Sequence, residues 1–289
     1  MKMLNIDEST NLDLSLITVG TCPKCGDNLV KFVHKRPDGS ERTAPFCKTC
    51  GHKELAKREA AEIAERYEKA TKQNMMDYFR NSSVCSDKDM FNCSFGSFEI
   101  VDQETKIATN NAARYARAIL QGEPHHLIMT GKTGTGKSHL AMAIARAYLK
   151  GSNYSKRCLF INYRELLEMM RNAFIDDDSR RKIHINLMKE IKRADLVVLD
   201  DLGAELGGST AGSSTTYNSD TLYSIVEARQ NKATIFTSNL SSEELKKSYG
   251  TRIISRMAKH SEGFTLKFSK TKDKRVTPLS MNKGGITID

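Results

Sequence analysis

The feature that most constrains this chain is a glycine-rich octapeptide, GKTGTGKS, at residues 131–138. It fits the phosphate-binding loop pattern G-x-x-x-x-G-K-[ST] at every fixed position. An apolar run at 127–130 precedes it, and an Ala-, Leu- and Met-rich stretch at 140–149 follows, which predicts strand, glycine loop and helix in succession. In such a loop, backbone N–H groups close around phosphate oxygens and the helix N-terminus adds its positive end. A chance glycine loop would lack these flanks, so the pattern predicts a nucleotide-binding α/β domain.

The loop residues are expected to bind ATP together with Mg²⁺. Lys137 would reach the β- and γ-phosphates, and Ser138 would ligate the metal. The other cofactor-binding residues that we predict are Gly131, Lys132, Thr133, Gly134, Thr135, Gly136 and His139.

A second apolar run, residues 195–201, ends in two carboxylates and suits the acidic strand of a phosphate-loop ATPase. Asp200 would hold Mg²⁺ through water, and Asp201 would orient the water that attacks the γ-phosphate. Asn239 ends a further predicted strand at 233–239 and could reach the γ-phosphate or that water. The alternative for Asn239 is a residue that merely ends its strand in a turn.

The remaining pattern predicts a mostly parallel sheet with helices between the strands. We interpret the strand at 157–162, which intervenes between the loop strand and the acidic strand, as the mark of ATPases with an extra central strand. The Gly-, Ser- and Thr-rich residues 207–219 predict a flexible surface loop. Other expected elements are helices at 53–80, 103–120, 165–174 and 249–257, and a fifth strand at 264–268.

Two C-x-x-C pairs near the N-terminus predict a structural zinc site in a small ribbon. The ligands would be Cys22, Cys25, Cys47 and Cys50, which can close a tetrahedral Zn²⁺ shell. Two disulfides or a dithiol redox site are the alternatives; a redox pair usually begins a helix, and neither pair is expected to. We therefore expect a zinc-binding ribbon domain at 1–52, a helix and linker at 53–90, and an ATPase domain at 91–289. The first 20 residues are expected to be partly disordered or a short helix.

The composition of the chain indicates which class of partner and which cellular compartment to expect. The net charge of +10 and pI near 9.2 favour a polyanionic partner such as nucleic acid. No apolar run approaches the roughly 18 residues of a membrane span, and the N-terminus carries no signal-peptide pattern. Seven cysteines without such a signal indicate a reducing compartment, so we expect a cytoplasmic protein.

Several motifs together resemble a known family. The phosphate loop, LDDLGAE at 199–205 and TSN at 237–239 stand in the order of the AAA+ ATPases, and NCSF at 92–95 and RIISRM at 252–257 narrow the match. They are similar to those of bacterial and phage replicative helicase loaders of the DnaC and DnaI type, within the IstB-like ATP-binding family, over roughly residues 90–280. The resemblance implies an AAA+ core with a central parallel sheet.

By this resemblance Asn239 would be the sensor-1 residue, and Arg256 the arginine finger that completes a neighbouring subunit's site, with Arg252 as its rival. Arg275 would be the sensor-2 arginine. Asp201 stands where most AAA+ proteins have Glu, which implies slow hydrolysis.

The implied function is ATP-dependent helicase loading. The partners would be a hexameric replicative DNA helicase, single-stranded DNA and further copies of this chain through the AAA+ domain. A transposition helper ATPase on duplex DNA and a non-catalytic adaptor are the alternatives. One of two basic surfaces is expected to contact the DNA backbone: the stretch at 246–283, or the six residues Arg180, Arg181, Lys182, Lys189, Lys192 and Arg193.

Overall fold

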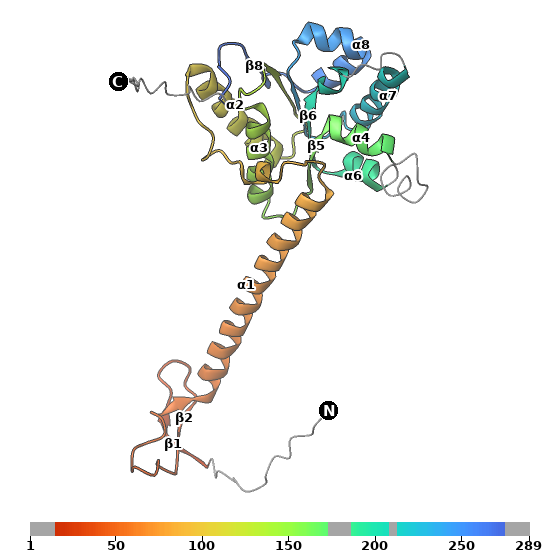
Figure 1. Ribbon diagram of the computed structural model, residues 1–289. Coiled ribbons are helices and arrows are strands. Elements are labelled where there is room, and N and C mark those ends of the chain that lie inside the picture. The colour runs from red at the N-terminus through yellow and green to blue at the C-terminus, as the bar shows by residue number, and fades with distance from the viewer. Residues whose placement is uncertain (1–14, 173–185, 208–212, 275–289) are drawn as a thin grey trace, which may run out of the picture. The chain divides into compact units, whose positions relative to one another are not determined.

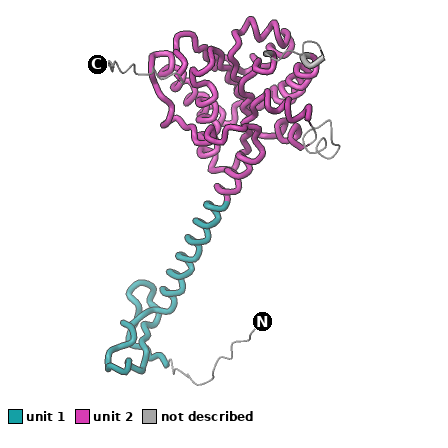
Figure 2. Tube along the Cα trace, viewed as in Figure 1, with its two compact units in different colours: residues 1–70 teal, residues 71–289 magenta. Residues whose placement is uncertain are grey.

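The computed structural model describes residues 15–172, 186–207 and 213–274 (Figure 1). The chain forms two compact units, Met1–Ala70 and Thr71–Asp289 (Figure 2). The division falls inside a long helix, whereas the sequence suggested divisions at the ends of segment 53–90. Among the described helices, none has the length and apolar character needed to span a membrane.

The first unit contains a three-stranded antiparallel sheet. Its strands are β1 (Leu16–Thr21), β2 (Asn28–Phe32) and β3 (Phe46–Cys47), in that order. Residues 16–20, for which partial disorder or a short helix was expected, form β1 instead, and residues 1–14 lie outside the described residues. This strand is almost wholly exposed, so it has no alternation of buried and exposed residues to reveal it, and its pairing with β2 defines it.

Helix α1 (Lys48–Ser82) begins directly after β3, five residues before the predicted start at Lys53. At its C-terminal end the Phe79 side chain is fully buried and packs edge-to-face on Phe91, with ring centroids 5.3 Å apart. Phe91 lies in the short helix η1 (Lys88–Asn92). The predicted linker, which ends at residue 90, is therefore partly core, because Val84 and Cys85 are buried in it and Phe91 is buried directly after it.

The second unit is built on five parallel strands: β4 (His126–Gly131), β5 (Cys158–Asn162), β6 (Leu196–Leu202), β7 (Thr234–Ser238) and β8 (Thr265–Phe268). Their order in the sheet is β5-β6-β7-β4-β8. The strand between the loop strand β4 and the acidic strand β6 is therefore β7. The sequence interpretation assigned that insertion to residues 157–162, which lie at the sheet edge as β5. Helical crossovers let a parallel strand join at either side, so order along the chain does not determine order in the sheet.

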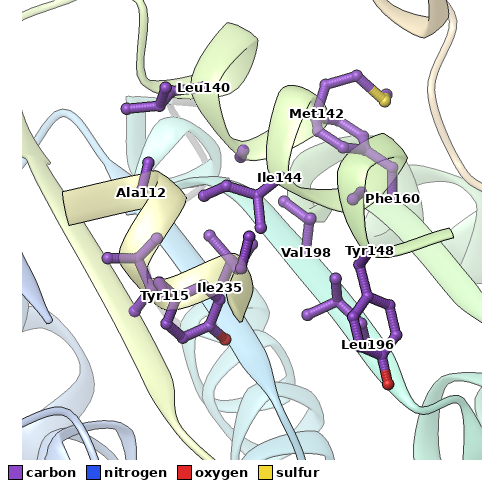
Figure 3. Packing of buried hydrophobic residues seen from close by; sticks show 14 of the residues in the cluster. Ala112, Tyr115, Leu140, Met142, Ile144, Tyr148, Phe160, Leu196, Val198 and Ile235 are labelled. Carbon is purple, nitrogen blue, oxygen red and sulfur yellow. The ribbon is translucent and has the colours of Figure 1, made fainter. Parts of the chain in front are cut away.

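Helices pack on the sheet to form two buried clusters. One contains residues of α2 (Gln103–Leu120) and α3 (Lys137–Gly151). In Figure 3 Tyr115 of α2 and Ile144 of α3 lie near Val198 and Ile235 of the sheet. The other cluster contains residues of α4 (Tyr163–Asn172), α6 (Met188–Arg193), α7 (Ser213–Ala228) and α8 (Ser242–Ala258). The predicted α/β class is confirmed.

Helix α7 corrects part of the prediction of a flexible loop over residues 207–219, since residues 213–219 are helical; residues 208–212 lie outside the described residues. Serine and threonine each disfavour a helix by well under about 1 kcal/mol. Leu222, Ile225 and Val226, farther along α7, are almost completely buried. Because packing of an apolar face supplies most helical stability in proteins, that burial outweighs the local preference.

Candidate nucleotide-binding site

The site lies where the carboxyl ends of β4, β6 and β7 meet. These strands are parallel, so the loop after β4, the acids at the end of β6 and the polar end of β7 share one sheet edge. A cavity of about 520 Å³ opens there. Its lining includes nine of the predicted site residues, namely Thr133, Gly134, Gly136, Lys137, Ser138, His139, Asp200, Asp201 and Asn239; the predicted loop residues Gly131, Lys132 and Thr135 are not among the lining residues.

Two loop positions require glycine. Gly134 has a φ of 77°, and a Cβ there would lie 1.7 Å from the Asp273 carboxylate. Gly136, the N-cap of α3, has a φ of 96°, and a Cβ there would lie 2.7 Å from the Phe98 ring. Only glycine adopts these backbone angles without strain and lets the neighbouring segments approach this closely.

Lys137 is the buried cation of the loop, with 8% of its surface exposed. Its Nζ donates to the carbonyl oxygens of Gly131, at 2.6 Å, and Lys132, at 2.8 Å. The Thr135 hydroxyl donates to the same Lys132 carbonyl at 2.9 Å. These bonds hold the loop around the ammonium group of Lys137. Lys137 lines the cavity, where it could contact the phosphates of a bound nucleotide.

Asp200 is an almost fully buried carboxylate in the same cavity, with 5% of its surface exposed. Thr237 Oγ1 donates to its Oδ1 at 2.6 Å, and the Ser138 hydroxyl is a further hydrogen-bond partner. Burial raises the pKa of Asp200 to about 6, although these two hydrogen bonds and the charge of Lys137 oppose the rise. Ser138 and Asp200 thus present adjacent oxygen donors, the ligand type that suits Mg²⁺.

Asp201 follows with a left-handed backbone, at a φ of 60°. Its N–H donates to Thr237 Oγ1 at 2.8 Å, so one threonine hydroxyl connects both acids. The sequence analysis assigned a role only to Asn239 at this strand end, and missed the contacts that Thr237 of the same TSN motif makes with both acids. The available signal was weak: hydroxyl residues at the end of a buried strand, with nothing local to indicate a contact 36 residues away.

Arg275 lies outside the described residues, as do Arg180, Arg181 and Lys182. The preceding Lys274 does line the cavity and was not predicted. Its N–H donates to the Gly134 carbonyl at 3.0 Å, and its Nζ lies 4.0 Å from the Phe98 ring centroid. Burial lowers the pKa of Lys274. This lysine therefore holds the segment after β8 against the phosphate loop.

The two arginines proposed as fingers, Arg252 and Arg256, lie on α8 and are absent from the cavity lining within the described chain. Arg256 forms an ion pair with Glu227 of α7. Within one chain, then, neither arginine joins the residues gathered at the phosphate loop.

The four predicted zinc ligands lie together in the first unit. Their Sγ atoms all fall within 4.8 Å of one another, with separations of 3.8, 3.5 and 3.4 Å for three of the pairs. Zinc–thiolate bonds of about 2.3 Å place the sulfurs of a tetrahedron about 3.8 Å apart, so the set fits Zn²⁺. The cysteines are free, which does not support the disulfide alternative. Neither pair was expected to begin a helix, but the second pair does, because Cys47 immediately precedes α1 and Cys50 lies in its first turn. The convergence of all four thiols therefore favours a metal site over a dithiol redox site.

The strand order, the phosphate loop and the two carboxylates that line the same cavity define an ATP-binding phosphate-loop protein with an AAA+ core. More particularly, the chain belongs to the family of IstB-like ATP binding proteins, whose sequence profile matches residues 53–271.

Individual relatives agree with this assignment. The replicative helicase loader DnaC of Escherichia coli K12 is 27% identical over 168 residues, which cover 57% of this chain and 63% of DnaC. The uncharacterized protein YdaV of the same strain is 25% identical over 234 residues, covering 80% of this chain and 87% of YdaV. The matched region thus spans less than two thirds of DnaC.

Solved structures support the fold. The crystal structure of the DnaC helicase loader aligns with a TM-score of 0.52 at 22% identity, over 63% of this chain and 99% of that one. A putative primosome component from Streptococcus pyogenes serotype M3 aligns with a TM-score of 0.51 at 16% identity, over 67% and 96% of the two chains.

Proposed function

We propose that this protein is an ATP-dependent replicative helicase loader, which binds a hexameric DNA helicase and single-stranded DNA. One observation carries the proposal: a single cavity is lined by the residues that ATP hydrolysis requires, in a chain that is similar to a helicase loader over 168 residues. These residues are Lys137, Ser138, Asp200, Asp201 and Asn239. The four-cysteine unit ahead of the ATPase unit offers a separate module for binding a partner.

In this proposal each cavity residue has one task. Lys137 and the loop amides neutralise and orient the phosphates of ATP. Ser138 and Asp200 would hold Mg²⁺, which supplies positive charge to the phosphate oxygens when bound. Asp201 orients the attacking water, and Asn239 contacts the water or the γ-phosphate. Asp201 is one methylene shorter than the Glu common in AAA+ proteins, so its hold on the water is looser and turnover is slow.

The cavity supplies no arginine for the charge that develops on the γ-phosphate, as far as the described residues extend. We assign that task to Arg256 of a neighbouring subunit, with Arg252 as the alternative. Arg275 of the same chain would contact the γ-phosphate as the sensor-2 residue. The protein therefore acts as an assembly, with each active site shared between two copies.

The test combines DNA preference with helicase recruitment. The purified protein should retain the host's replicative helicase in a pull-down, and with ATP should bind single strands more tightly than duplex, with affinity that falls as salt rises. Lys137→Ala is the control that removes nucleotide binding. Preference for duplex would favour the transposition helper, and no turnover with or without DNA would favour the adaptor. Either result overturns the loader proposal.

A further inference from the structure

The two arginines of α8 rest on a pair of residues from α7. Tyr223 and Glu227 are four residues apart on α7, and Arg252 and Arg256 are four residues apart on α8, so each pair lies on one helix face. The guanidinium carbons of Arg252 and Arg256 lie 4.4 and 4.9 Å from the Tyr223 ring centroid. Two arginines thus share one aromatic ring, a favourable cation–π arrangement.

Arg256 is held more firmly than Arg252. Its Nε donates to the Glu227 carboxylate, and its Nη1 donates to the Arg252 carbonyl at 3.0 Å. The same hydrogen bond, followed by the charge of Arg256 and a bond from Tyr223, lowers the pKa of Glu227, so this carboxylate is charged at neutral pH. In the part of the chain that the structure describes, Nη2 of Arg256 makes no hydrogen bond, which leaves its two N–H donors for another acceptor.

We propose that Tyr223 and Glu227 are positioning residues for Arg256, and that they orient it toward the active site of a neighbouring subunit; this inference rests on the proposed function. Arg256 is then the finger, because two of its nitrogens are fixed within its own chain and the third is available. Arg252 is exposed; its guanidinium stacks on Tyr223, and its charge contributes less than that of Arg256 to the lowered pKa of Glu227. Its task is to supply the carbonyl that accepts from Arg256.

The surrounding helix supports this division of tasks. At Gly250 the backbone of α8 leaves helical geometry, with a φ of 80° and a ψ of 161°. The segment that carries both arginines is therefore not aligned by a continuous helix. It is fixed by the buried side chains of Ile253 and Met257 on one face and by Tyr223 and Glu227 on another.

A positioned arginine increases the rate more than a mobile one. A long side chain loses conformational freedom when it is immobilised, and a donor already in place needs no reorganisation when charge develops. The Arg256–Glu227 pair contributes little to folding, since its side chains are 23% and 43% exposed and surface pairs are weak. The main effect of the pair is to fix the orientation of the Arg256 side chain. An ion pair that served only to stabilise the fold would not have this effect on the rate.

The first experiment measures ATP turnover of Glu227→Gln and Tyr223→Leu in the full chain under assembling conditions. We expect kcat to fall on the order of tenfold for each, with the KM for ATP unchanged, because the phosphate loop is untouched. Glu227→Asp should recover part of the rate. Asp220→Asn, which neutralises an exposed acid on the same helix, is the matched control and should behave like the parent. A rate increase in Glu227→Gln would mean that Glu227 restrains the finger, and an unchanged kcat would mean that it does nothing; either overturns the proposal.

The second experiment tests whether these residues act across the subunit boundary. Glu227→Gln chains keep their phosphate loop, and Lys137→Ala chains keep an intact Arg256 with its supports. Mixing the two should give more activity than the sum of the separate preparations. Arg256→Ala mixed with Lys137→Ala tests the shared site itself. If that mixture recovers activity and the Glu227→Gln mixture does not, the positioning role is wrong and the shared site stands. If neither recovers, the shared site fails, and the positioning role with it.

Discussion

Replacing Asp200 by asparagine should make the nucleotide-free protein more stable, although it removes the residue that we assign to the metal. The carboxylate is 5% exposed, and burial raises its pKa from 3.8 to about 6. Asparagine keeps an oxygen that can accept from Thr237 Oγ1, so the substitution chiefly removes a buried negative charge. The structure thus predicts that this position lowers stability in favour of ligand binding.

The size of the effect follows from the two pKa values. The unfolded carboxyl titrates near 3.8 and the folded one near 6, a difference worth about 3 kcal/mol of unfolding free energy. Well below pH 3.8 the carboxyl is protonated in both the folded and the unfolded state, so the buried charge has no cost there. As pH rises the folded state resists ionisation, so the parent loses stability relative to the variant. The free energy of unfolding of Asp200→Asn should exceed that of the parent by about 2 kcal/mol at pH 5 and by about 3 kcal/mol at pH 8.

The assay is urea unfolding of the full chain, followed by circular dichroism in magnesium-free buffer between pH 5 and 8. Subtracting the parent's unfolding free energy from that of the variant cancels the contribution of the zinc unit, which both proteins share. The exposed Asp220→Asn serves as a control and should give a difference near zero at each pH. Adding ATP with Mg²⁺ should stabilise the parent far more than Asp200→Asn. A variant that is less stable than the parent at pH 8, or a difference that does not grow with pH, would refute the reasoning.

Three further predictions test other parts of the site. Lys137→Ala should abolish ATP binding, measured by loss of the nucleotide-induced rise in melting temperature, because it removes the buried cation of the loop; a variant with normal binding would contradict that role. Asp201→Asn should bind ATP nearly as tightly as the parent but hydrolyse it slowly, and parental turnover would show that another group orients the water. Purified protein should contain one Zn²⁺ per chain, and chelation should remove amide protection from residues 16–47; metal analysis that finds no zinc, with the four thiols paired as disulfides, would exclude the site.

The local sequence was enough to predict the phosphate loop and helix α2, because the interactions that define each of them lie within one segment of the chain. The phosphate loop could be recognised because its glycines, Lys137 and Ser138 act within eight consecutive residues. Helix α2 occupies the predicted span, Gln103–Leu120. A capping box at Asp102 and Thr105 starts it, and its buried residues recur at helical spacing, so the signals for its start and its face are both local.

Tertiary structure decided what depends on residues far apart in the chain. Helix α7 forms because its apolar residues are buried, and β7 enters the sheet between β6 and β4 through pairing that chain order does not reveal. Thr237 joins Asp200 and Asp201 only because two strands lie side by side. Glu227 meets Arg256 only because α7 packs on α8. A single hydrogen bond or ion pair contributes little to folding, so it leaves no periodic pattern in the sequence, and its partners are brought together by the burial of the core around them.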